Sequence, residues 1–345
     1  MIGLIGSLCD DRESASGQAV RTTILYNVLC KKYGKQNIYN VNTHGFRLNP
    51  IKVIYKTLMC IIKCEHIIVM VHENGRKVFF PILYYAKIIL GRKIYHNVIG
   101  GSFREYLNKN SNLIKYSKNF NIHWVQMSSQ IIKLKEIGLH NVELLPNTKE
   151  NKILALKEIH NYEDIVFRFC MCSRISIAKG TEIAIRAIEN INKKKGYKIV
   201  TLDIFGKPDD DYIERFNNVI ENSSEAIRYC GFIPNDRTVY KLKEYYMLLF
   251  PSTYEGEGFP GTFWDAFAAG LPIITTDWHY NSEIVSDNLT GLVYDYRDES
   301  MLEKKIEYAI NNINNINRMK VACIVEAQKY APEKVFPIIF KYLSK

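Results

Sequence analysis

Short apolar runs alternate with longer amphipathic segments along the whole chain. Continuous apolar runs predict buried strands, and segments whose apolar residues recur every three to four positions predict helices. In the first half the predicted strands are residues 1–6, 38–42, 66–71, 94–99, 122–127 and 142–145, with helical patterns at 18–33, 50–63 and 77–90. In the second half the predicted strands are 165–172, 198–205, 227–230, 246–251 and 272–276, with helical patterns at 180–195, 211–222, 236–245 and 260–269. Such alternation indicates parallel sheets with helices on both faces.

Two sets of alternating elements, in a chain of 345 residues, predict two doubly wound, Rossmann-like α/β domains. The boundary is expected in the polar, lysine-rich passage 146–164, which gives domains of residues 1–150 and 151–345. Near the end of the chain the pattern predicts a helix, a break at Pro332 and a last helix. Because the break separates the last helix from the second domain, we expect that this helix can pack back onto the first domain.

Composition and apolar run lengths favour a folded protein of the cytoplasm. The chain is 47% hydrophobic and 24% charged, which suits a buried core. Its first residues read as a strand and lack the pattern of a signal peptide. The apolar stretch 78–90 contains Pro81 and Lys87 and is too short to span a bilayer. The eight cysteines have neither CxxC pairs nor zinc spacing, which predicts reduced thiols.

The positive charge is unevenly distributed. The net charge is +10, but residues 1–150 hold 21 Lys and Arg against 9 Asp and Glu, and the remainder holds 25 against 27. The excess in the first half predicts an anionic partner there, such as nucleic acid, a membrane surface or a phosphorylated substrate. A generally basic composition without a specific partner is the alternative.

Three loops follow predicted strands and open predicted helices, where open α/β sheets bind ligands. Free N–H groups at helix starts suit phosphate. The first loop, residues 10–22, is small and polar around Gly17, whose missing side chain lets backbone approach a ligand. The loop lacks the GxGxxG pattern, which argues against a nicotinamide cofactor. An ordinary surface loop is the alternative.

The second loop contains a Gly-Gly pair at a predicted strand end. His96 lies just before Gly100 and Gly101, and Ser102 with Glu105 has the spacing of a capping box. His96 is a candidate functional residue because of the adjacent glycines and helix start. A structural histidine is the equal alternative.

The third loop carries two cations. Arg174 and Lys179 flank a short segment after a predicted strand, and Gly180 then opens a helix. Two cations beside a helix N-terminus form a clamp for a diphosphate, because charge-assisted hydrogen bonds to phosphate oxygens are strong. Solvated basic side chains are the alternative.

A fourth segment, YEGEGFPGTFWDAFAAGLPI at 254–273, places two glutamates, an aspartate and four glycines around a short aromatic run. A buried strand precedes it, and the helical run TFWDAFAA ends at Gly270. Seven residues separate Glu257 from Asp265, whereas the same spacing from Glu255 reaches the apolar Phe263. The pattern therefore pairs Glu257 with Asp265.

This segment resembles the E-x7-E signature of retaining, nucleotide-sugar-dependent glycosyltransferases of the GT-B fold, family 4 type. The residues that match are Glu257, Gly258, Phe259, Ala266, Ala268, Gly270 and Pro272. The stretches SRISIAKG, VELLPN, NSEIVSDNLTGLVYD, SGQAVRT and NVIGG resemble other parts of such enzymes. The resemblance covers nearly the whole chain and is most specific in the second half. Asp265 departs from it, since a glutamate is usual there.

The resemblance implies roles for individual residues. Glu257 would contact hydroxyls of the donor sugar, and Asp265 would hold the ribose despite a side chain about 1.5 Å shorter than glutamate. Backbone at Gly258, Phe259 and Pro260 would hold the sugar, and Ile233 is also expected to contact the donor. Arg174, Lys179 and Gly17 would stabilise the diphosphate. His96, with Glu257, is the predicted catalytic residue.

The implied reaction transfers a sugar from a nucleoside-diphosphate sugar to an acceptor with retention of configuration, in a GT-B protein of two domains facing a cleft. No cofactor or metal is expected, and the acidic run 209–211 reads as a solvated helix start. A nucleotide-sugar epimerase is one alternative. A nucleic-acid-binding protein is another, suggested by the basic charge and 23 tyrosines, but no motif of that class is present.

Charge is the only sequence evidence on the acceptor. The segments 50–63 and 77–90 combine apolar faces with lysines and arginines, as interfacial helices do. They predict peripheral binding to the inner face of a membrane, where a lipid-linked saccharide of a surface polysaccharide would be the acceptor. Ordinary core helices with solvated lysines are the equal alternative.

Overall fold

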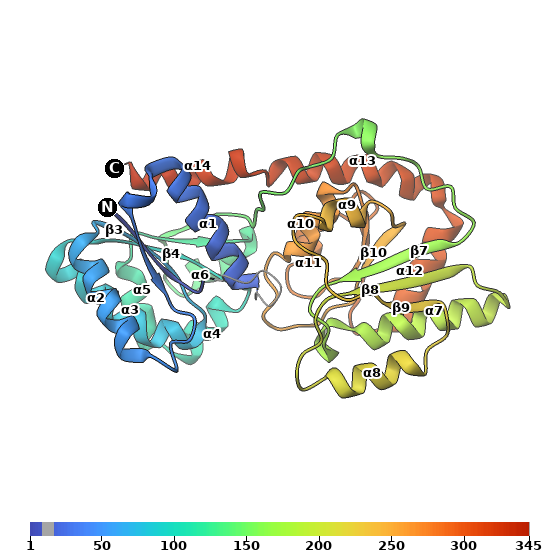
Figure 1. Cartoon of the computed structure of the whole chain (residues 1–345), viewed down its shortest axis with the longest axis horizontal. Coiled ribbons are helices and arrows are strands. Elements are labelled where there is room, and N and C mark those ends of the chain that lie inside the picture. The colour runs from blue at the N-terminus through green and yellow to red at the C-terminus, as the bar shows by residue number, and fades with distance from the viewer. Residues whose placement is uncertain (9–16, 345) are drawn as a thin grey trace. The chain divides into compact units, whose positions relative to one another are not determined.

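The computed structural model describes residues 1–8 and 17–344. The chain forms two compact units, Met1–Lys149 with Pro332–Lys345, and Glu150–Ala331. Each unit contains a six-stranded parallel sheet with helices on both faces (Figure 1). The predicted fold class, α/β with two doubly wound parallel sheets, is confirmed.

The first unit has the strand order β2-β1-β3-β4-β5-β6. Its strands are β1 (Ile2–Gly6), β2 (Ile38–Asn42), β3 (His66–Met70), β4 (Lys93–Asn97), β5 (Ile122–Val125) and β6 (Val142–Leu144). Its α-helices are α1 (Gly17–Tyr33), α2 (Pro50–Lys63), α3 (Glu73–Leu90), α4 (Phe103–Lys109), α5 (Asn112–Asn119), α6 (Ser128–Glu136) and α14 (Pro332–Leu343).

The last helix, α14, packs on the first sheet. Phe336 and Ile339 join a buried cluster with Leu25 of α1 and Trp124 of β5. The hydroxyl of Tyr95 donates to the carbonyl of Tyr342 at 3.0 Å. Helices α2 and α3 supply a separate cluster on the other face. The apolar face of α14 is therefore buried against a sheet that is far away in sequence.

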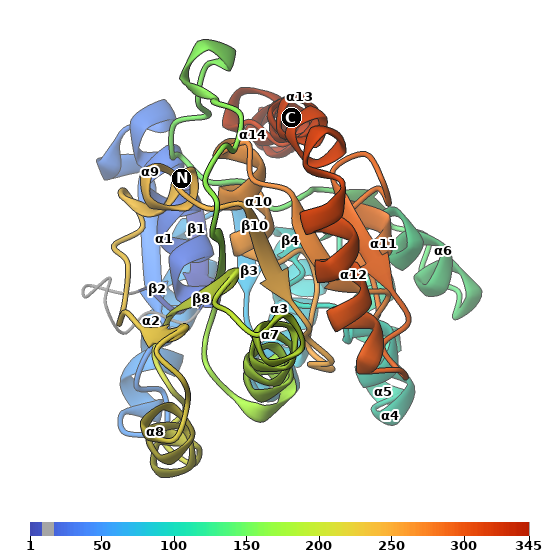
Figure 2. The same ribbon diagram turned by 90° about the vertical axis from the view of Figure 1, so that its right-hand side faces the viewer.

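The second unit has the strand order β12-β11-β10-β7-β8-β9. Its strands are β7 (Phe167–Cys172), β8 (Val200–Phe205), β9 (Ile227–Tyr229), β10 (Met247–Phe250), β11 (Ile273–Thr276) and β12 (Gly291–Tyr294). Its α-helices are α7 (Thr181–Lys195), α8 (Ile213–Glu221), α9 (Thr238–Leu242), α10 (Gly261–Ala268), α11 (Asn281–Ile284), α12 (Ser300–Asn311) and α13 (Ile313–Lys329). Helices α7 and α12 lie alongside the strands and share their core cluster (Figure 2).

Two local predictions need correction. The strand β12 (Gly291–Tyr294) was not among the predicted strands. The capping box at Ser102 and Glu105 does not form. Ser102 has φ −85° and ψ 17°, outside the extended region that points a capping hydroxyl at the helix amides. Its hydroxyl donates instead to Oε1 of Glu73 at 3.1 Å.

Within residues 1–8 and 17–344, no helix is both long and apolar enough to cross a bilayer.

Candidate active site

Three loops of the second unit meet at one edge of its sheet. They follow β7, β10 and β11, which are neighbours in the sheet and run parallel. Since parallel strands end at the same edge, the loops that begin at Ser173, Pro251 and Asp277 lie together. Arg174 and Lys179, which lie on one sequence motif, are thereby brought together with Glu257, which lies on another.

A buried ion pair forms the centre of this edge. Lys179 Nζ pairs with Oε2 of Glu257, and each residue is only 8% exposed. The hydroxyl of Ser252, itself fully buried, donates to the same Oε2 at 3.0 Å. Removing one partner of a buried pair leaves an uncompensated charge, so the two side chains hold each other in place. Glu255, by contrast, is exposed, in agreement with its assignment as a loop acid.

A chain of hydrogen bonds ties the next strand to this pair. Asn281 Nδ2 donates to the hydroxyl of Thr276 at 3.2 Å, and that hydroxyl donates to the carbonyl of Ser252 at 2.7 Å. All three residues are at most 2% exposed. None of the three was predicted from the sequence. Thr276 ends β11, Ser252 lies two residues after β10 and Asn281 opens α11, so their places near strand ends were the available signal.

Both predicted cations lie over one aromatic ring. Lys179 Nζ is 4.9 Å and Arg174 Cζ 5.3 Å from the ring centroid of Tyr254. The Arg174 side chain is 52% exposed and its Nε is 3.3 Å from Oδ1 of Asp209. The Tyr254 ring thus fixes two positive groups at the sheet edge, one buried and one open to solvent.

A glycine makes the approach of the loops possible. Gly180 has φ +72°, and a Cβ there would lie 2.3 Å from the carbonyl oxygen of Pro251. The amide of Thr253 donates to the carbonyl of Ala178 at 2.8 Å, which joins the two loops. Only glycine allows this close contact, because any side chain would collide with backbone.

The remaining residues that the sequence predicted to bind the donor are buried or half-buried. Gly258 and Pro260 are buried, and the Phe259 ring packs edge-on against Tyr330 at 4.8 Å. The Phe259 side chain therefore points into the core, so only its backbone can meet a ligand. Ile233 is half-buried in the loop after the edge strand β9.

Asp265 has a local partner that the sequence did not predict. It is 2% exposed on α10, and Oδ1 accepts a hydrogen bond from Asn151 Nδ2 at 3.2 Å. Asn151 also donates to the carbonyl of Asn235 at 2.7 Å. Any ribose hydroxyl that binds Asp265 must share this carboxylate with Asn151.

The acidic run 209–211 is divided. Asp210 and Asp211 are exposed before α8, whereas Asp209 pairs with Arg174. Among the residues that the structure describes, no three His, Cys, Asp or Glu side chains are grouped as metal ligands would be.

The other predicted residues, Gly17 and His96, belong to the first unit. Gly17 is the exposed first residue of α1, and most of its loop, residues 10–16, lies outside the described residues. The predicted contact between this loop and the diphosphate therefore stays a prediction.

His96, a predicted catalytic residue, lies in the core of the first unit. Its ring is fully buried on β4, between Phe80 at 4.9 Å and Phe103 at 5.0 Å, so it cannot contact a substrate in this conformation. Its Nδ1 is 2.9 Å from Nδ1 of His123, whose Nε2 donates to the carbonyl of Ser117 at 2.9 Å. Burial holds the pKa of His96 well below its usual value and lowers the pKa of His123 to about 4, so both rings are neutral at physiological pH.

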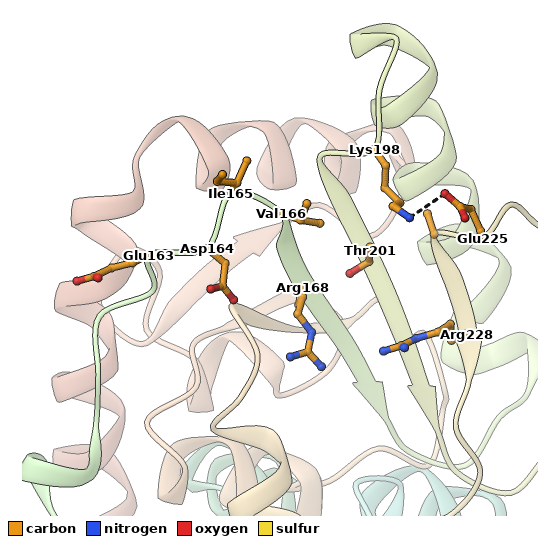
Figure 3. Close-up of a pocket in the computed structure, with 10 residues that line it drawn as sticks. Glu163, Asp164, Ile165, Val166, Arg168, Lys198, Thr201, Glu225 and Arg228 are labelled. Carbon is orange, nitrogen blue, oxygen red and sulfur yellow. Dashed lines mark hydrogen bonds and ion pairs between the residues drawn. The ribbon is translucent and has the colours of Figure 1, made fainter.

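A hollow of about 620 Å³ lies at the opposite end of the second sheet, by the amino ends of β7, β8 and β9. Figure 3 shows the side chains of Arg168 and Arg228 on either side of Thr201. The charges are largely paired internally. Arg228 donates two hydrogen bonds, of 2.8 and 2.7 Å, to the carboxylate of Asp203. Lys198 forms an ion pair with Glu225 at 2.7 Å. This hollow is separate from the edge that carries Lys179 and Glu257.

A family model matches most of the second unit. Residues 166–312 match the family model described as glycosyl transferases group 1. These residues include Arg174, Lys179, Glu257 and Asp265. No curated protein matches the sequence.

Solved structures match all or most of the chain. HepE of Anabaena, in complex with UDP-glucose, is 14% identical with a TM-score of 0.73, and 100% of this chain and 99% of HepE are covered. Sucrose-phosphate synthase of Thermosynechococcus elongatus is 14% identical with a TM-score of 0.79, and 99% and 98% are covered. The pneumococcal O-GlcNAc transferase GtfA, in complex with UDP and GlcNAc, is 15% identical with a TM-score of 0.63, and 81% and 56% are covered. At these identities the likeness shows the fold, which is GT-B.

Proposed function

We propose that the protein is a glycosyltransferase that moves a sugar from a nucleoside-diphosphate sugar to a saccharide acceptor. The observation that carries the proposal is the buried Lys179–Glu257 pair, set beside the exposed cation Arg174 at the carboxyl edge of the second sheet. The match of residues 166–312 to the glycosyl transferases group 1 supports it. The UDP-glucose bound to HepE, a protein of the same fold, suggests a UDP-sugar as donor.

The charged side chains at this edge of the sheet suit a reaction in which a nucleoside diphosphate is the leaving group. Negative charge develops on the leaving phosphate, and fixed cations lower the energy of that state most effectively where water is limited. Arg174 offers guanidinium donors to phosphate, and Lys179 is held close by. Oε2 of Glu257 already accepts from Lys179 and Ser252, so the proposed contact with a donor hydroxyl uses Oε1.

We assign no covalent enzyme intermediate and infer a retaining reaction. Glu257 is engaged in a buried ion pair, so its role in the proposal is to orient the sugar and Lys179, not to attack carbon. Arg174 and Lys179 supply the positive charge that a metal ion would otherwise give to the diphosphate. The two alternatives from the sequence, an epimerase and a nucleic-acid-binding protein, receive no support from the comparisons.

The test is a thermal-shift screen of UDP-, GDP- and ADP-sugars, followed by product analysis. A transferase stabilised by one of them should release the nucleoside diphosphate and give a glycoside of unchanged anomeric configuration. Formation of an epimer without free nucleoside diphosphate would support the epimerase instead. No stabilisation by any nucleotide would remove the proposal.

The acceptor side rests on an exposed apolar stripe in the first unit. On α2, Ile51, Tyr55, Leu58 and Ile62 are 85%, 62%, 49% and 61% exposed. Their spacing of three to four residues places them on one face of the helix. At the end of α3, Ile88 and Ile89 are 58% and 72% exposed.

The ends of these two helices are joined. Arg92, which follows α3, donates to the carbonyl groups of Ile61 and Ile62 on α2 at 2.8 and 3.0 Å. Lys52, Lys56 and Lys63 lie on α2 among the apolar residues. Such a large exposed apolar area with a basic rim is typical of an interaction surface.

We propose that this face binds an anionic membrane on its cytoplasmic side. The apolar stripe would enter the interface, and the lysines would add roughly 1 kcal/mol each near an anionic surface. A lipid-linked saccharide, such as a precursor of a surface polysaccharide, is the acceptor that this location favours. The basic charge of residues 1–150 supports the same partner.

A further inference from the structure

Three aromatic side chains gather beside the candidate active site. Trp278 and His279 follow β11, and Tyr296 follows β12. The Trp278 ring is 4.5 Å from the His279 ring and 4.7 Å from the Tyr296 ring, between centroids. His279 is exposed, Tyr296 is 38% exposed and Trp278 is half-buried. We call these three residues the aromatic platform.

A hydrogen bond connects the aromatic platform to the loop that carries Glu257. Nε1 of Trp278 donates to the carbonyl of Tyr254 at 3.0 Å. The ring of that same tyrosine lies under Arg174 and Lys179. Oδ1 of Asp277 accepts from the amide of Tyr296 at 3.0 Å, which joins the two loops of the platform. The platform therefore has a fixed orientation next to the cations.

The backbone at the platform is in a costly conformation. Among the described residues, the non-glycine residues with positive φ are His279, at 51°, and Asn288, at 59°. Asparagine tolerates this region because its short side chain bonds locally, and histidine does so less readily than glycine. Strained residues of this kind cluster at ligand-binding sites, although single ones also occur in turns. His279 thus keeps an imidazole at a position where glycine would be the relaxed choice.

We infer that the aromatic platform binds a pyranose ring of the saccharide that is transferred or extended, an inference that rests on the proposed function. A pyranose has one face of C–H groups that carry partial positive charge, and an aromatic face is negative, so the two attract when stacked. The hydroxyl of Tyr296 and the nitrogens of His279 add hydrogen-bonding groups at the rim. Because Trp278 is held by Tyr254, little side-chain entropy is lost on binding.

The test uses two glycine substitutions at the two strained positions. His279→Gly removes the strain and the platform side chain together. Asn288→Gly is the matched control, because it relieves a similar φ at an exposed turn by the amino end of β12, the opposite edge of the sheet. Both variants should fold with an unchanged or raised melting temperature. Tyr296→Leu is a second platform variant, and Tyr197→Leu, at a residue 59% exposed before β8, is its control.

Binding is measured in two ways. Saturation-transfer NMR with methyl glycosides of glucose, galactose, mannose and N-acetylglucosamine tests the platform without any nucleotide. Calorimetry with UDP and with the UDP-sugars gives the affinity that the sugar adds to the nucleotide. We expect His279→Gly and Tyr296→Leu to lower sugar affinity about three- to tenfold, the range for one aromatic contact, and the control variants to leave it unchanged.

The outcomes separate the source of the sugar and the two proposals. Loss of the increment between UDP and UDP-sugar would place the donor sugar on the platform. Loss confined to the free glycosides, with unchanged UDP-sugar binding, would place the acceptor there. Absence of glycoside and UDP-sugar binding by the unaltered protein, or equal losses in the control variants, would overturn the platform. If UDP itself fails to bind while glycosides do, the proposed donor fails and the saccharide site stands.

Discussion

Lys179 and Glu257 lie 78 residues apart in sequence and form an ion pair that is almost fully buried. Their loops leave neighbouring strands, β7 and β10, at the same edge of the second sheet. The pair receives a further hydrogen bond from Ser252 on Oε2, and Tyr254 lies against the ammonium group. A charged pair in this position is costly to bury, so its presence at a ligand-binding edge points to use in binding or catalysis.

The substitution Glu257→Gln should lower kcat by at least about 100-fold, which corresponds to about 2.7 kcal/mol in the barrier. The amide keeps the size of the side chain and one carbonyl acceptor for Lys179, so the protein should still fold, but the melting temperature should fall because the buried ammonium group loses its counter-charge. Steady-state kinetics and thermal unfolding would measure both effects. Glu255→Gln is the control, because Glu255 is exposed on the same loop. Equal losses in both variants would show that the acid pair has been assigned in the wrong register.

Arg174→Ala should weaken binding of UDP but not of uridine, because the proposed contact is to phosphate. Its side chain is 52% exposed, so stability should change little. Calorimetric titration with the two ligands is the measurement. Arg186→Ala is the matched control, with a side chain 54% exposed and an ion pair to Glu299 on the surface of the second unit. A parallel loss of uridine binding would instead indicate a structural role for Arg174.

Gly180→Ala should destabilise the protein strongly. An alanine at this position would have to adopt φ +72°, and its Cβ would lie 2.3 Å from the carbonyl oxygen of Pro251. Gly196→Ala separates the cost of the backbone conformation from the cost of the collision. Gly196 has φ +78°, but a Cβ added there would have no neighbouring atom within 4 Å. We expect about 1 kcal/mol for Gly196→Ala, from the backbone conformation alone, and a clearly larger loss for Gly180→Ala. Similar free energies of unfolding for the two variants would mean that the loop after β7 moves away from Pro251 without cost.

Transfer activity should persist in excess EDTA, since Arg174 and Lys179 are proposed to take the place of a cation at the diphosphate. Activity with and without the chelator, and after adding back magnesium or manganese, is the measurement. Loss on chelation with recovery on addition of metal would contradict the proposal. The exposed carboxylates of Asp210 and Asp211 would then be the first ligands to test.

The exposed stripe on α2 should bind vesicles that contain anionic lipid. Binding in co-sedimentation should fall between low and physiological salt, because the lysine contribution is screened. The double substitution Ile51→Ser with Ile62→Ser should abolish binding and leave the melting temperature nearly unchanged, since both side chains are more than 60% exposed. Leu156→Ser, at an exposed residue of the second unit, is the control. Binding to neutral vesicles as strong as to anionic ones would refute the electrostatic part of the proposal.

The sequence by itself predicted the two α/β sheets, which the structure confirms, and it predicted that Glu257 and Asp265 are the paired acids. Alternating apolar runs report local burial, and local burial is what defines a strand or helix in this fold class. The strand β12 was missed, although strands as short as β9 were predicted. Glu257 could be separated from Glu255 because only the former has an acid at the corresponding position on the next helix.

Only the tertiary structure decided which side chains meet. Sheet order brings Lys179 to Glu257, and β11 next to β10 joins Thr276 to Ser252, neither of which can be read from spacing along the chain. The same is true of burial. His96 has the sequence setting of an active-site residue, yet neighbouring strands and helices enclose it completely with aromatic rings. Local pattern fixes the elements because it depends on residues a few positions apart, whereas partners and exposure depend on how distant elements pack.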